Sequence, residues 1–575
     1  MFLNQLNTIR DSMVRDLLRP QKILIAGNGV QNPEHLLSAS EIQNGFFSTD
    51  VTVLTNQDGK NPTLLLDFGK EIHGGIKFIT AACSSADGKR IRVTFGESVG
   101  EAMRDNFNGN GFSDHSVHQA AVKLPQSGDF EFGNTGFRFV RIELTDADSL
   151  IEIISIYGVF VHRDIEFKGK FECSDSLIND IYDTAAHTCF LNMQTYLWDG
   201  IKRDRVVWAG DMHPHIMALR TVFGNDPIVR ESLKHVAGKY PPSAFPNGMV
   251  TYGMWWVMSL YDWYQYSGDK KLLDELADYL KSLLLSFANL INPDGSDSLG
   301  SVRRGYFFDW PTFEKPEAAA GVRALLSRAL TAGAELCKIL NENNLEEVCR
   351  EKAKALNLYT ASHINKNTYT DKNSWEKSKQ AAAMMFLAGQ LDKKRVANVL
   401  AYKNGYGLSV YMGYYILTAA AQSSGINIAA AMMKEYFGGM ISAGATSFWE
   451  DFDVDWLKPG ATIERVLQPG EYDIHGDNGA HCYESHRHSL CHAWGSGVAA
   501  FIAENILGVQ ILKPGCNEIR IAPQLGDLEW ARGVYPTPHG NVNIEHIKEN
   551  GKISTKITAP DEIEIKCENI KRRYR

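Results

Sequence analysis

The chain has 575 residues, of which 44% are hydrophobic and 22% are charged, and its formal net charge is -9. This length exceeds what one hydrophobic core normally fills, so we expect about two to four domains. The negative charge argues against nucleic acid or an anionic membrane surface as the main partner.

The nine cysteines are scattered singly, with no Cys-x-x-Cys pair. This usage is typical of reduced, buried thiols rather than of a disulfide framework. Residues 1–10 lack a basic segment followed by an apolar one, so no secretory signal is visible and we expect a cytoplasmic protein. Residues 404–433 contain no Asp, Glu, Lys or Arg. Gly, Gln, Ser and Asn interrupt this stretch, so it predicts two buried helices joined by a turn rather than a membrane span.

Residues 1–165 have the pattern of β-structure. Short alternating runs at 63–68, 75–80, 91–95 and 139–144 are separated by Gly, Asn, Asp and Ser. Strands at regular spacing with turn residues between them favour an antiparallel sandwich. The Gly-Asn-Gly at 109–111 lies in a polar loop and not between a strand and a helix, so it is not a phosphate-binding turn.

Residues 166–505 have the pattern of successive amphipathic helices. Ser174 or Asp175 is expected to cap a first helix, which carries apolar residues at helical spacing. The clearest later helices are predicted at 252–266, 272–290, 318–341, 347–364, 378–387 and 411–421. About a dozen helices without intervening strands favour a helical toroid, because no fixed repeat supports a solenoid. Residues 506–575 return to short strands, as at 510–515, 518–523 and 541–545, and predict a small C-terminal β-domain.

Residues 197–211 concentrate charge and aromatic side chains. They include three acids, three cations and two tryptophans: Asp199, Asp204, Asp211, Lys202, Arg203, Arg205, Trp198 and Trp208. If the segment is helical, Asp204, Trp208 and Asp211 share one face. Paired carboxylates are what glycoside cleavage requires. A solvated ion-pair helix is the competing interpretation of this composition.

A second acidic segment, residues 444–453, places Glu450 beside Trp449 and near Asp451 and Asp453. An acid next to an indole and other acids favours its neutral form, as in many catalytic sites. Two loops at one end of a toroid would bring Glu450 opposite the first segment. An exposed acidic loop is the alternative.

Further candidates are less specific. The histidine-rich stretch contains His475, His481, His486, His488 and His492, but its spacing matches no familiar zinc motif. We therefore expect no metal, and one or two of these histidines in a polar pocket. For His213 and His215 a packing role is expected. Trp255 and Trp256 are more typical of a core, and Asp309 beside Trp310 is a better site candidate.

In this order the motifs resemble those of family 78 of the glycoside hydrolases, the α-L-rhamnosidases. The first motif is Asp199-x3-Arg203-Asp204-Arg205-x2-Trp208-x-Gly210-Asp211. It is followed by Asp309-Trp310, Trp449-Glu450 and Ser489-x-x-His492. Strand motifs near residues 67–75 and 95–97, and residues 507–540 of the tail, also resemble the family's flanking domains.

The resemblance implies an (α/α)6 barrel between an N-terminal antiparallel β-sandwich and a small C-terminal β-domain. It implies an inverting exo-glycosidase that removes terminal non-reducing α-L-rhamnose from small rhamnosides, without a cofactor. Asp204 would be the general acid and Glu450 the base. The residues implied in substrate binding are Asp199, Arg203, Trp208, Asp211, Trp255, Trp256, Trp310 and His492.

The chain departs from the family pattern at the proton donor. Many relatives carry two consecutive acids in the first motif, commonly with Glu as the donor, whereas Asp204 stands alone between Arg203 and Arg205. Asp is shorter by one methylene, about 1.5 Å of reach. A contacting arginine would favour the charged form of a proton donor, so we expect both arginines to have other partners.

Two alternatives remain open at the level of sequence. One is another (α/α)6-barrel glycosidase, glucoamylase-like or an unsaturated uronyl hydrolase. The other is a sugar-binding relative without turnover, which the missing second acid would explain. The expected partner is a small-molecule or oligosaccharide rhamnoside, and the sequence leaves the oligomeric state open, a homodimer included.

Overall fold

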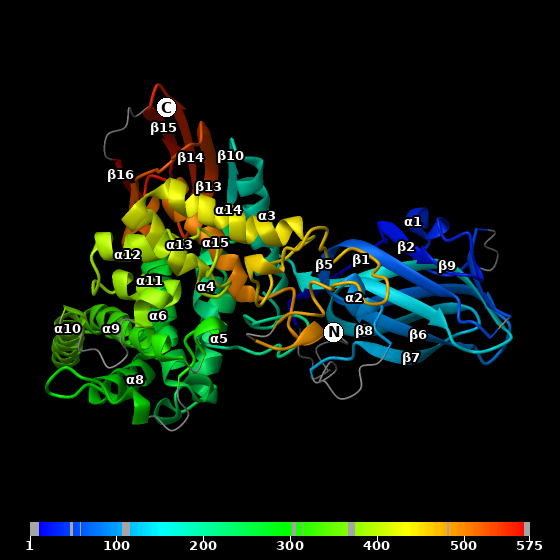
Figure 1. The fold of residues 1–575 in the computed structure, drawn as a ribbon, viewed down its shortest axis with the longest axis horizontal. Helices are drawn as coiled ribbons and strands as arrows, with labels where there is room; N and C mark the ends of the chain where they lie inside the picture. Colours follow the sequence, from blue (N-terminus) through cyan, green and yellow to red (C-terminus); the bar gives the residue numbers. More distant parts are fainter. Residues whose placement is uncertain are drawn as a thin grey trace, which may run out of the picture.

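The computed structural model describes residues 11–45, 50–57, 59–105, 115–301, 306–313, 315–365, 374–479 and 482–567. The chain forms an N-terminal sheet domain, a helical middle and a small C-terminal sheet region (Figure 1). His481 and the 109–111 loop lie outside the described residues.

The N-terminal domain is a network of nine strands in the order β3-β4-β9-β5-β8-β6-β7, with β1 paired to β9 and β2 to β5. Its strands are β1 (Met13–Leu18), β2 (Lys22–Ala26), β3 (Val30–Gln31), β4 (Thr52–Asn56), β5 (Thr63–Cys83), β6 (Lys89–Gly96), β7 (Gln119–Leu124), β8 (Gly128–Leu144) and β9 (Ser149–Arg163). All pairings are antiparallel, as expected. The two strands predicted at 63–68 and 75–80 form one long strand, β5, whose register shifts at two bulges.

Two short helices accompany these strands, α1 (His35–Ser38) and α2 (Val99–Ala102). Leu64, Phe78, Phe95, Val140 and Ile156 are among the side chains that fill a core of their own in this domain. Buried and half-buried residues alternate along β4, as expected for a strand with one face on the core, although neither β4 nor β7 was among the strands predicted from the sequence.

The helical middle runs from α3 to α15. Its helices are α3 (Ser176–Leu191), α4 (Met212–Val222), α5 (Pro227–Lys239), α6 (Val250–Ser267), α7 (Lys270–Glu275), α8 (Ala277–Asn289), α9 (Pro316–Ile339), α10 (Asn343–Asn365), α11 (Lys379–Leu387), α12 (Lys393–Leu400), α13 (Gly413–Ser424), α14 (Ile426–Ser442) and α15 (Val498–Phe501). The helix predicted at 272–290 is divided into α7 and α8 at Leu276, where φ is -101° and ψ is 1°.

The uncharged stretch around residue 425 forms two helices, as predicted. Gly425, with a φ of +95°, separates α13 from α14, a conformation that L side chains rarely adopt. The search for membrane-spanning helices in the described residues found none that is both long and apolar enough.

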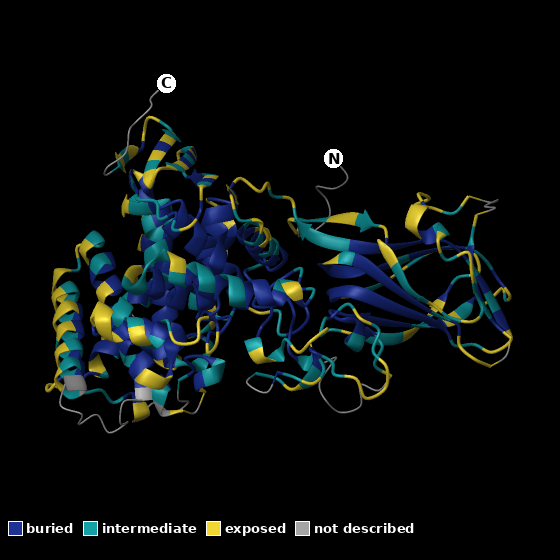
Figure 2. Cartoon of the chain, turned by 45° about the horizontal axis from the view of Figure 1, so that its top comes forward, coloured by how far each residue is buried: buried dark blue, intermediate teal, exposed yellow. Residues whose placement is uncertain are grey.

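The C-terminal strands form two sheets, β10-β13-β14-β15 and β11-β12-β16. They are β10 (Lys170–Cys173), β11 (Val509–Lys513), β12 (Glu518–Ile521), β13 (Trp530–Thr537), β14 (Gly540–Glu549), β15 (Lys552–Thr558) and β16 (Glu564–Cys567). Strand β10 precedes the first helix in sequence but pairs with β13, so it joins the C-terminal sheet. The helical middle and these sheets share one apolar core (Figure 2). The nine cysteines form no disulfide in the described part of the chain, and seven are buried.

The first helix of the middle, α3, begins at a side-chain cap. Asp175 Oδ1 accepts hydrogen bonds from the backbone N–H groups of Leu177 (3.0 Å) and Ile178 (3.4 Å). Its Oδ2 lies 3.0 Å from Lys434 Nζ on α14. Asp175 therefore stabilises the start of α3 and its contact with α14.

We predict that Asp175→Ala lowers the free energy of unfolding by about 1 kcal/mol, because two N–H groups lose their acceptor. Chemical denaturation followed by far-ultraviolet circular dichroism measures this change. Asp175→Asn is the matched control: it keeps the cap acceptor and loses only a partly exposed ion pair, so it should cost less. Equal losses in the two variants would contradict the capping role.

Candidate active site

Residues 197–211 form an irregular loop rather than a helix. Asp204 and Arg205 have φ values of +53° and +59°, in the left-handed region, and α4 begins only at Met212. The common helical face considered for Asp204, Trp208 and Asp211 is therefore absent. The loop itself brings the three side chains together, and Trp208 Nε1 donates to Asp204 Oδ2 over 2.9 Å.

Backbone contacts fix this loop internally and to the segment after residue 489. The backbone N–H of Val206 donates to Asp199 Oδ1 (3.0 Å), which closes the loop on itself. The N–H of Ala493 donates to the carbonyl of Asp199 (2.7 Å), and Gly200 forms an isolated bridge with His492. These contacts place the side chain of Asp199 near that of His492.

The segment that contacts Asp199, residues 489–494, also contacts Glu450. The backbone N–H of Glu450 donates to the carbonyl of Ser489 (2.8 Å), and the N–H of Ser489 donates to Glu450 Oε2 (3.0 Å). Trp494 Nε1 donates to the carbonyl of Glu450 (3.1 Å). Both the backbone and the carboxylate of Glu450 are thus positioned, and the side chain is buried.

The two acidic segments meet at a pocket of about 210 Å³. Its lining residues are Asp199, Arg203, Asp204, Trp208, Asp211, Met249, Tyr252, Phe307, Trp310, Phe313, Glu450, Tyr483, His492 and Trp494. Of the ten residues that the family resemblance implies in catalysis or substrate binding, eight line this pocket. Four carboxyl groups face one cavity with aromatic walls, which is the composition expected for recognition of a sugar ring.

Arg203 lies between the two proposed catalytic carboxylates. Its Nη1 donates to Asp204 Oδ1 over 3.0 Å, and its Nη2 forms an ion pair with Glu450 Oε1. The guanidinium is stacked on the ring of Tyr483, 4.0 Å from its centroid. The expectation that both flanking arginines have other partners is wrong for Arg203, because the loop turns its side chain into the pocket.

Arg205 does have other partners. It donates to the backbone carbonyl and to Oδ1 of Asn134 on β8, over 2.9 and 2.8 Å, and its guanidinium lies over the ring of Trp198. The left-handed backbone at Asp204 and Arg205 explains why neighbouring arginines point in different directions.

Burial and neighbouring charges shift the pKa values of several pocket residues. Burial, with Asp204 and Glu450 nearby, raises the pKa of Asp199 well above its usual value. Burial and the same acids, together with Asp199, raise the pKa of Asp211. Both side chains therefore favour the neutral form, which can donate a hydrogen bond. Burial works against the charged form of Arg203, but Glu450 and Asp204 outweigh it and raise its pKa.

Three polar atoms on pocket residues have no hydrogen-bond partner among the described residues. They are Asp211 Oδ1, Trp310 Nε1 and His492 Nδ1. Buried polar groups are almost always paired, so unpaired atoms on residues that line a cavity are candidates for contact with a polar ligand. A polyhydroxylated ligand would supply both donors and acceptors to them.

Trp255 and Trp256 are not brought to the pocket. Both are fully buried in the second turn of α6: Trp255 packs against Tyr411 and Tyr415, and Trp256 Nε1 donates to the carbonyl of Leu233 (3.2 Å). The pocket lies at the N-terminal end of α6, so Tyr252 in the first turn reaches it instead.

Asp309 does not line the pocket, although its neighbour Trp310 does. Its Oδ1 accepts from the N–H of Trp310 (2.9 Å), and its Oδ2 accepts from the Ser409 hydroxyl. It holds the turn that presents Trp310.

Several pocket residues were missed by sequence reasoning. The ring of Tyr483 makes cation–π contacts with Arg203 and Arg487, whose guanidinium carbons lie 4.0 and 4.1 Å from the ring centroid. Trp494 stacks on His492 with ring centroids 3.9 Å apart. His115, from the sheet domain, lies outside the pocket lining but accepts from the N–H of Asp204 through Nδ1 (2.9 Å). Tyr483 and Trp494 lie close in sequence to the candidate histidines and could have been predicted from that proximity. His115 lies near no candidate motif in the sequence, so nothing there indicated its contact with Asp204.

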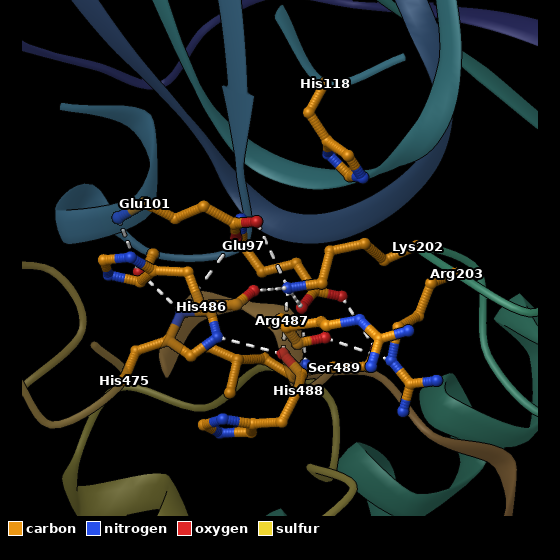
Figure 3. Close-up of polar contacts among 12 residues, drawn as sticks. Glu97, Glu101, His118, Lys202, Arg203, His475, His486, Arg487, His488 and Ser489 are labelled. Atoms are coloured by element: carbon orange, nitrogen blue, oxygen red, sulfur yellow. Dashed lines mark hydrogen bonds and ion pairs between the residues drawn. The ribbon is translucent and has the colours of Figure 1, made fainter. Parts of the chain in front are cut away.

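Three other histidines of the same stretch, His475, His486 and His488, form a separate buried cluster (Figure 3). His475, His486 and His488 pack edge to face, and burial lowers the pKa of His475 well below its usual value. Glu97, Glu101 and His475 are near enough to share a metal ion. However, Lys202 Nζ lies 2.9 Å from Glu97 Oε2 and 3.2 Å from Glu101 Oε1, so an ammonium group already supplies the positive charge there.

His213 and His215 have structural roles in the helical middle. His213 is hydrogen-bonded to the hydroxyl of Tyr415 (2.6 Å) and to Asp262 Oδ2 (2.8 Å). His215 Nε2 contacts the carbonyl of Cys189 (3.0 Å). These contacts agree with the packing role expected for both.

Comparison with known proteins gives matches over most of the chain. A curated alpha-L-rhamnosidase of Formosa agariphila is 21% identical over 561 residues, which cover 87% of this chain and 54% of that protein. The structure of a family 78 rhamnosidase of Bacillus sp. GL1 superimposes with a TM-score of 0.74 at 20% identity, covering 94% of this chain and 56% of that one. The chain thus spans about half the length of these relatives.

A rhamnosidase from Klebsiella oxytoca, solved with rhamnose bound, is closer in length. It matches with a TM-score of 0.67 at 20% identity, covering 85% of this chain and 95% of that one. At these identities the solved structures establish the shared fold: an N-terminal sheet domain, a helical middle and a small C-terminal sheet region.

Family-level matches cover the middle and the tail. Residues 166–506 match the bacterial alpha-L-rhamnosidase 6 hairpin glycosidase domain, and residues 508–567 match the bacterial alpha-L-rhamnosidase C-terminal domain. The first of these alone covers more than half of the chain. The chain therefore belongs to the α-L-rhamnosidases of glycoside hydrolase family 78.

Proposed function

We propose that this protein is an inverting exo-α-L-rhamnosidase that removes a terminal, non-reducing α-L-rhamnose from small rhamnosides. The observation that carries the proposal is that four residues with carboxyl groups line one small pocket, and that three of the lining residues carry a buried polar atom without a partner among the described residues. Family membership supports the choice of sugar. The domains proposed are a β-sandwich at 1–165, an (α/α)6 barrel at 166–505 and a β-domain at 506–575.

The size of the pocket supports exo action. Sites for drug-sized ligands occupy roughly 300–1,000 Å³, whereas this cavity measures about 210 Å³. It suits one sugar ring rather than a stretch of polysaccharide. Trp208 and Trp310 would wall the ring, and Asp199, Arg203, Asp211 and His492 would bind its hydroxyl groups.

In the proposed reaction Asp204 protonates the glycosidic oxygen as its bond to the anomeric carbon breaks. Glu450 takes a proton from a water molecule as that water attacks the opposite face of the anomeric carbon. The products are rhamnose of inverted anomeric configuration and the released alcohol. Arg203 keeps the two carboxylates apart by the width of a guanidinium group, which supports a mechanism that needs space for water between them.

Arg203 must also let Asp204 act as an acid. Both oxygens of Asp204 accept hydrogen bonds, Oδ1 from Arg203 and Oδ2 from Trp208. A bound sugar offers Arg203 hydroxyl acceptors in exchange. We propose that substrate draws the guanidinium from Asp204 Oδ1, so that the free oxygen holds the proton for the leaving group.

The substrate assignment is tested with a panel of chromogenic glycosides. We expect release from 4-nitrophenyl α-L-rhamnoside and little from the α-D-glucoside or the β-D-glucuronide, because family membership points to rhamnose as the sugar. Faster hydrolysis of either of the other sugars would favour another barrel glycosidase. Binding of L-rhamnose by calorimetry with no hydrolysis of any substrate would show a sugar-binding protein instead.

The acid and base roles predict distinct mutant behaviour. Asp204→Asn and Glu450→Gln should each lower kcat by roughly 10²-fold or more. The Asp204 variant should be impaired least with a 2,4-dinitrophenyl leaving group, which needs no protonation. Azide, a nucleophile that needs no base, should partly restore the Glu450 variant.

Asp453→Asn is the matched control for these variants. Asp453 lies on the same segment as Glu450, but its Oδ1 accepts from the N–H of Asp455 (2.9 Å) and it does not line the pocket. We expect kcat close to wild type. Near-normal turnover by Asp204→Asn would refute Asp204 as the acid and direct attention to Asp199 or Asp211.

The stereochemical course is a separate prediction. Proton NMR spectra recorded during hydrolysis should show the β-anomer of rhamnose first, followed by mutarotation. First formation of the α-anomer would mean retention, which requires a nucleophile and carboxyl groups roughly 5–5.5 Å apart.

A further inference from the structure

A second buried charge cluster lies where the sheet domain meets the loops that carry Lys202 and His486 (Figure 3). Glu97 follows β6, and Glu101 lies in α2, so both belong to the N-terminal domain. Their side chains are fully buried, and the Nζ of Lys202 contacts both. Lys202 also donates to the backbone carbonyls of His486 (2.7 Å) and His488 (2.9 Å).

The cluster costs free energy to bury, but Lys202 is ion-paired and hydrogen-bonded within it, and directional contacts of this kind favour one geometry. Burial disfavours the ammonium of Lys202, but Glu101 and Glu97 outweigh burial and raise its pKa. Burial raises the pKa of Glu97, while Lys202 acts in the opposite direction. Removing one member leaves the others buried without compensation.

Glu97 has a set of contacts that Glu101 lacks. Glu97 Oε1 accepts from the Ser489 hydroxyl (3.0 Å), and Glu97 Oε2 accepts from the N–H of Leu490 (2.5 Å). Ser489 is the residue whose backbone N–H donates to Glu450 Oε2 and whose carbonyl accepts from the N–H of Glu450. One residue therefore separates Glu97 from the proposed base.

The carboxylate of Glu97 also contacts the 197–211 loop, through its ion pair with Lys202. Lys202 and Arg203 are consecutive, and their side chains diverge: Lys202 contacts Glu97, and Arg203 contacts Asp204 and Glu450. Glu97 thus binds both the loop that carries the proposed acid and the segment that supports the proposed base.

We propose that Glu97 is a positioning residue of the N-terminal domain, which sets the geometry of Glu450 through Ser489 and that of the 197–211 loop through Lys202. This inference rests on the proposed function, because it concerns the same acid and base. The sheet domain would then contribute to catalysis by positioning the acid and the base. The side chain of Glu97 does not itself line the pocket.

The test compares Glu97→Gln with Glu101→Gln in the full-length protein. The two residues are equally buried, and each change removes one negative charge next to Lys202, but only Glu97 touches Ser489 and Leu490. We expect Glu97→Gln to lower kcat at least about tenfold with KM little changed, since displacing a catalytic group by an ångström costs up to about 10²-fold. Glu101→Gln should lose several-fold less.

The pH profile separates positioning from a general loss of folding. If Glu97→Gln loosens the Ser489 N–H from Glu450, the base loses a hydrogen bond that stabilises its charged form. The acidic limb of the kcat/KM profile should then move to higher pH, whereas a smaller folded fraction lowers the whole profile without moving it. Ser489→Ala should change the profile in the same direction, and the double variant should lose less than the sum of the two.

The outcomes are distinct for each claim. Equal kcat losses in Glu97→Gln and Glu101→Gln, or a loss confined to KM, would overturn the positioning role. If the wild type hydrolyses no glycoside, or Glu450→Gln stays fully active, the proposed function fails instead. A crystal structure of Glu97→Gln then decides the positioning claim alone: we expect residues 489–490 displaced from Glu450, and an unchanged contact would overturn the inference.

Discussion

The pocket depends on one buried guanidinium placed between two carboxylates. Arg203 pairs with Asp204, its neighbour in sequence, and with Glu450, 247 residues away. Without it, the buried carboxylate of Glu450 and the partly buried carboxylate of Asp204 would repel each other across the same cavity. In the proposed mechanism Arg203, which contacts both carboxylates, must release Asp204 before proton transfer.

The three parts of the fold contribute unequally to this arrangement. The helical middle and the C-terminal sheets share one continuous apolar core, which gives a stiff frame for the loops that carry Asp204 and Glu450. The sheet domain has a separate core. Its junction with the loops contains the buried charges of Glu97, Glu101 and Lys202, beside apolar contacts such as the packing of Phe160 against the cluster that includes Ile201. Directional polar contacts of this kind fix orientation, whereas apolar contacts tolerate sliding.

Much of the fold was predictable because its signals are local. The cap at Asp175, the helix predicted at 318–341 and the strand at 91–95 each rest on periodicity within a single element, and each is present. The ordered motifs predicted most of the pocket lining for a similar reason, since each motif is a contiguous run of residues. Strand β10 was not predictable in this way, because its partner β13 lies more than 350 residues later.

The errors have physical causes too. The possible helical face of residues 197–211 ignored two consecutive left-handed residues, which no helix accommodates. For Trp255 and Trp256, residue type alone predicted a core position, which is confirmed, whereas the binding role implied by the family resemblance does not agree with their depth along α6. The contact of Arg203 with Asp204 could not be inferred from spacing, because it depends on where the loop meets Glu450. Likewise, Glu97 and His115 belong to another domain and reach the loops only through tertiary structure.

The most direct test of the account is a crystal structure of the protein with L-rhamnose. We expect the ring in the pocket, between Asp204 and Glu450, with hydroxyl groups within hydrogen-bond distance of Asp211 Oδ1 and Trp310 Nε1, and with Arg203 turned from Asp204 toward the sugar. Rhamnose bound elsewhere, with the contacts of Arg203 to Asp204 and Glu450 unchanged, would contradict it.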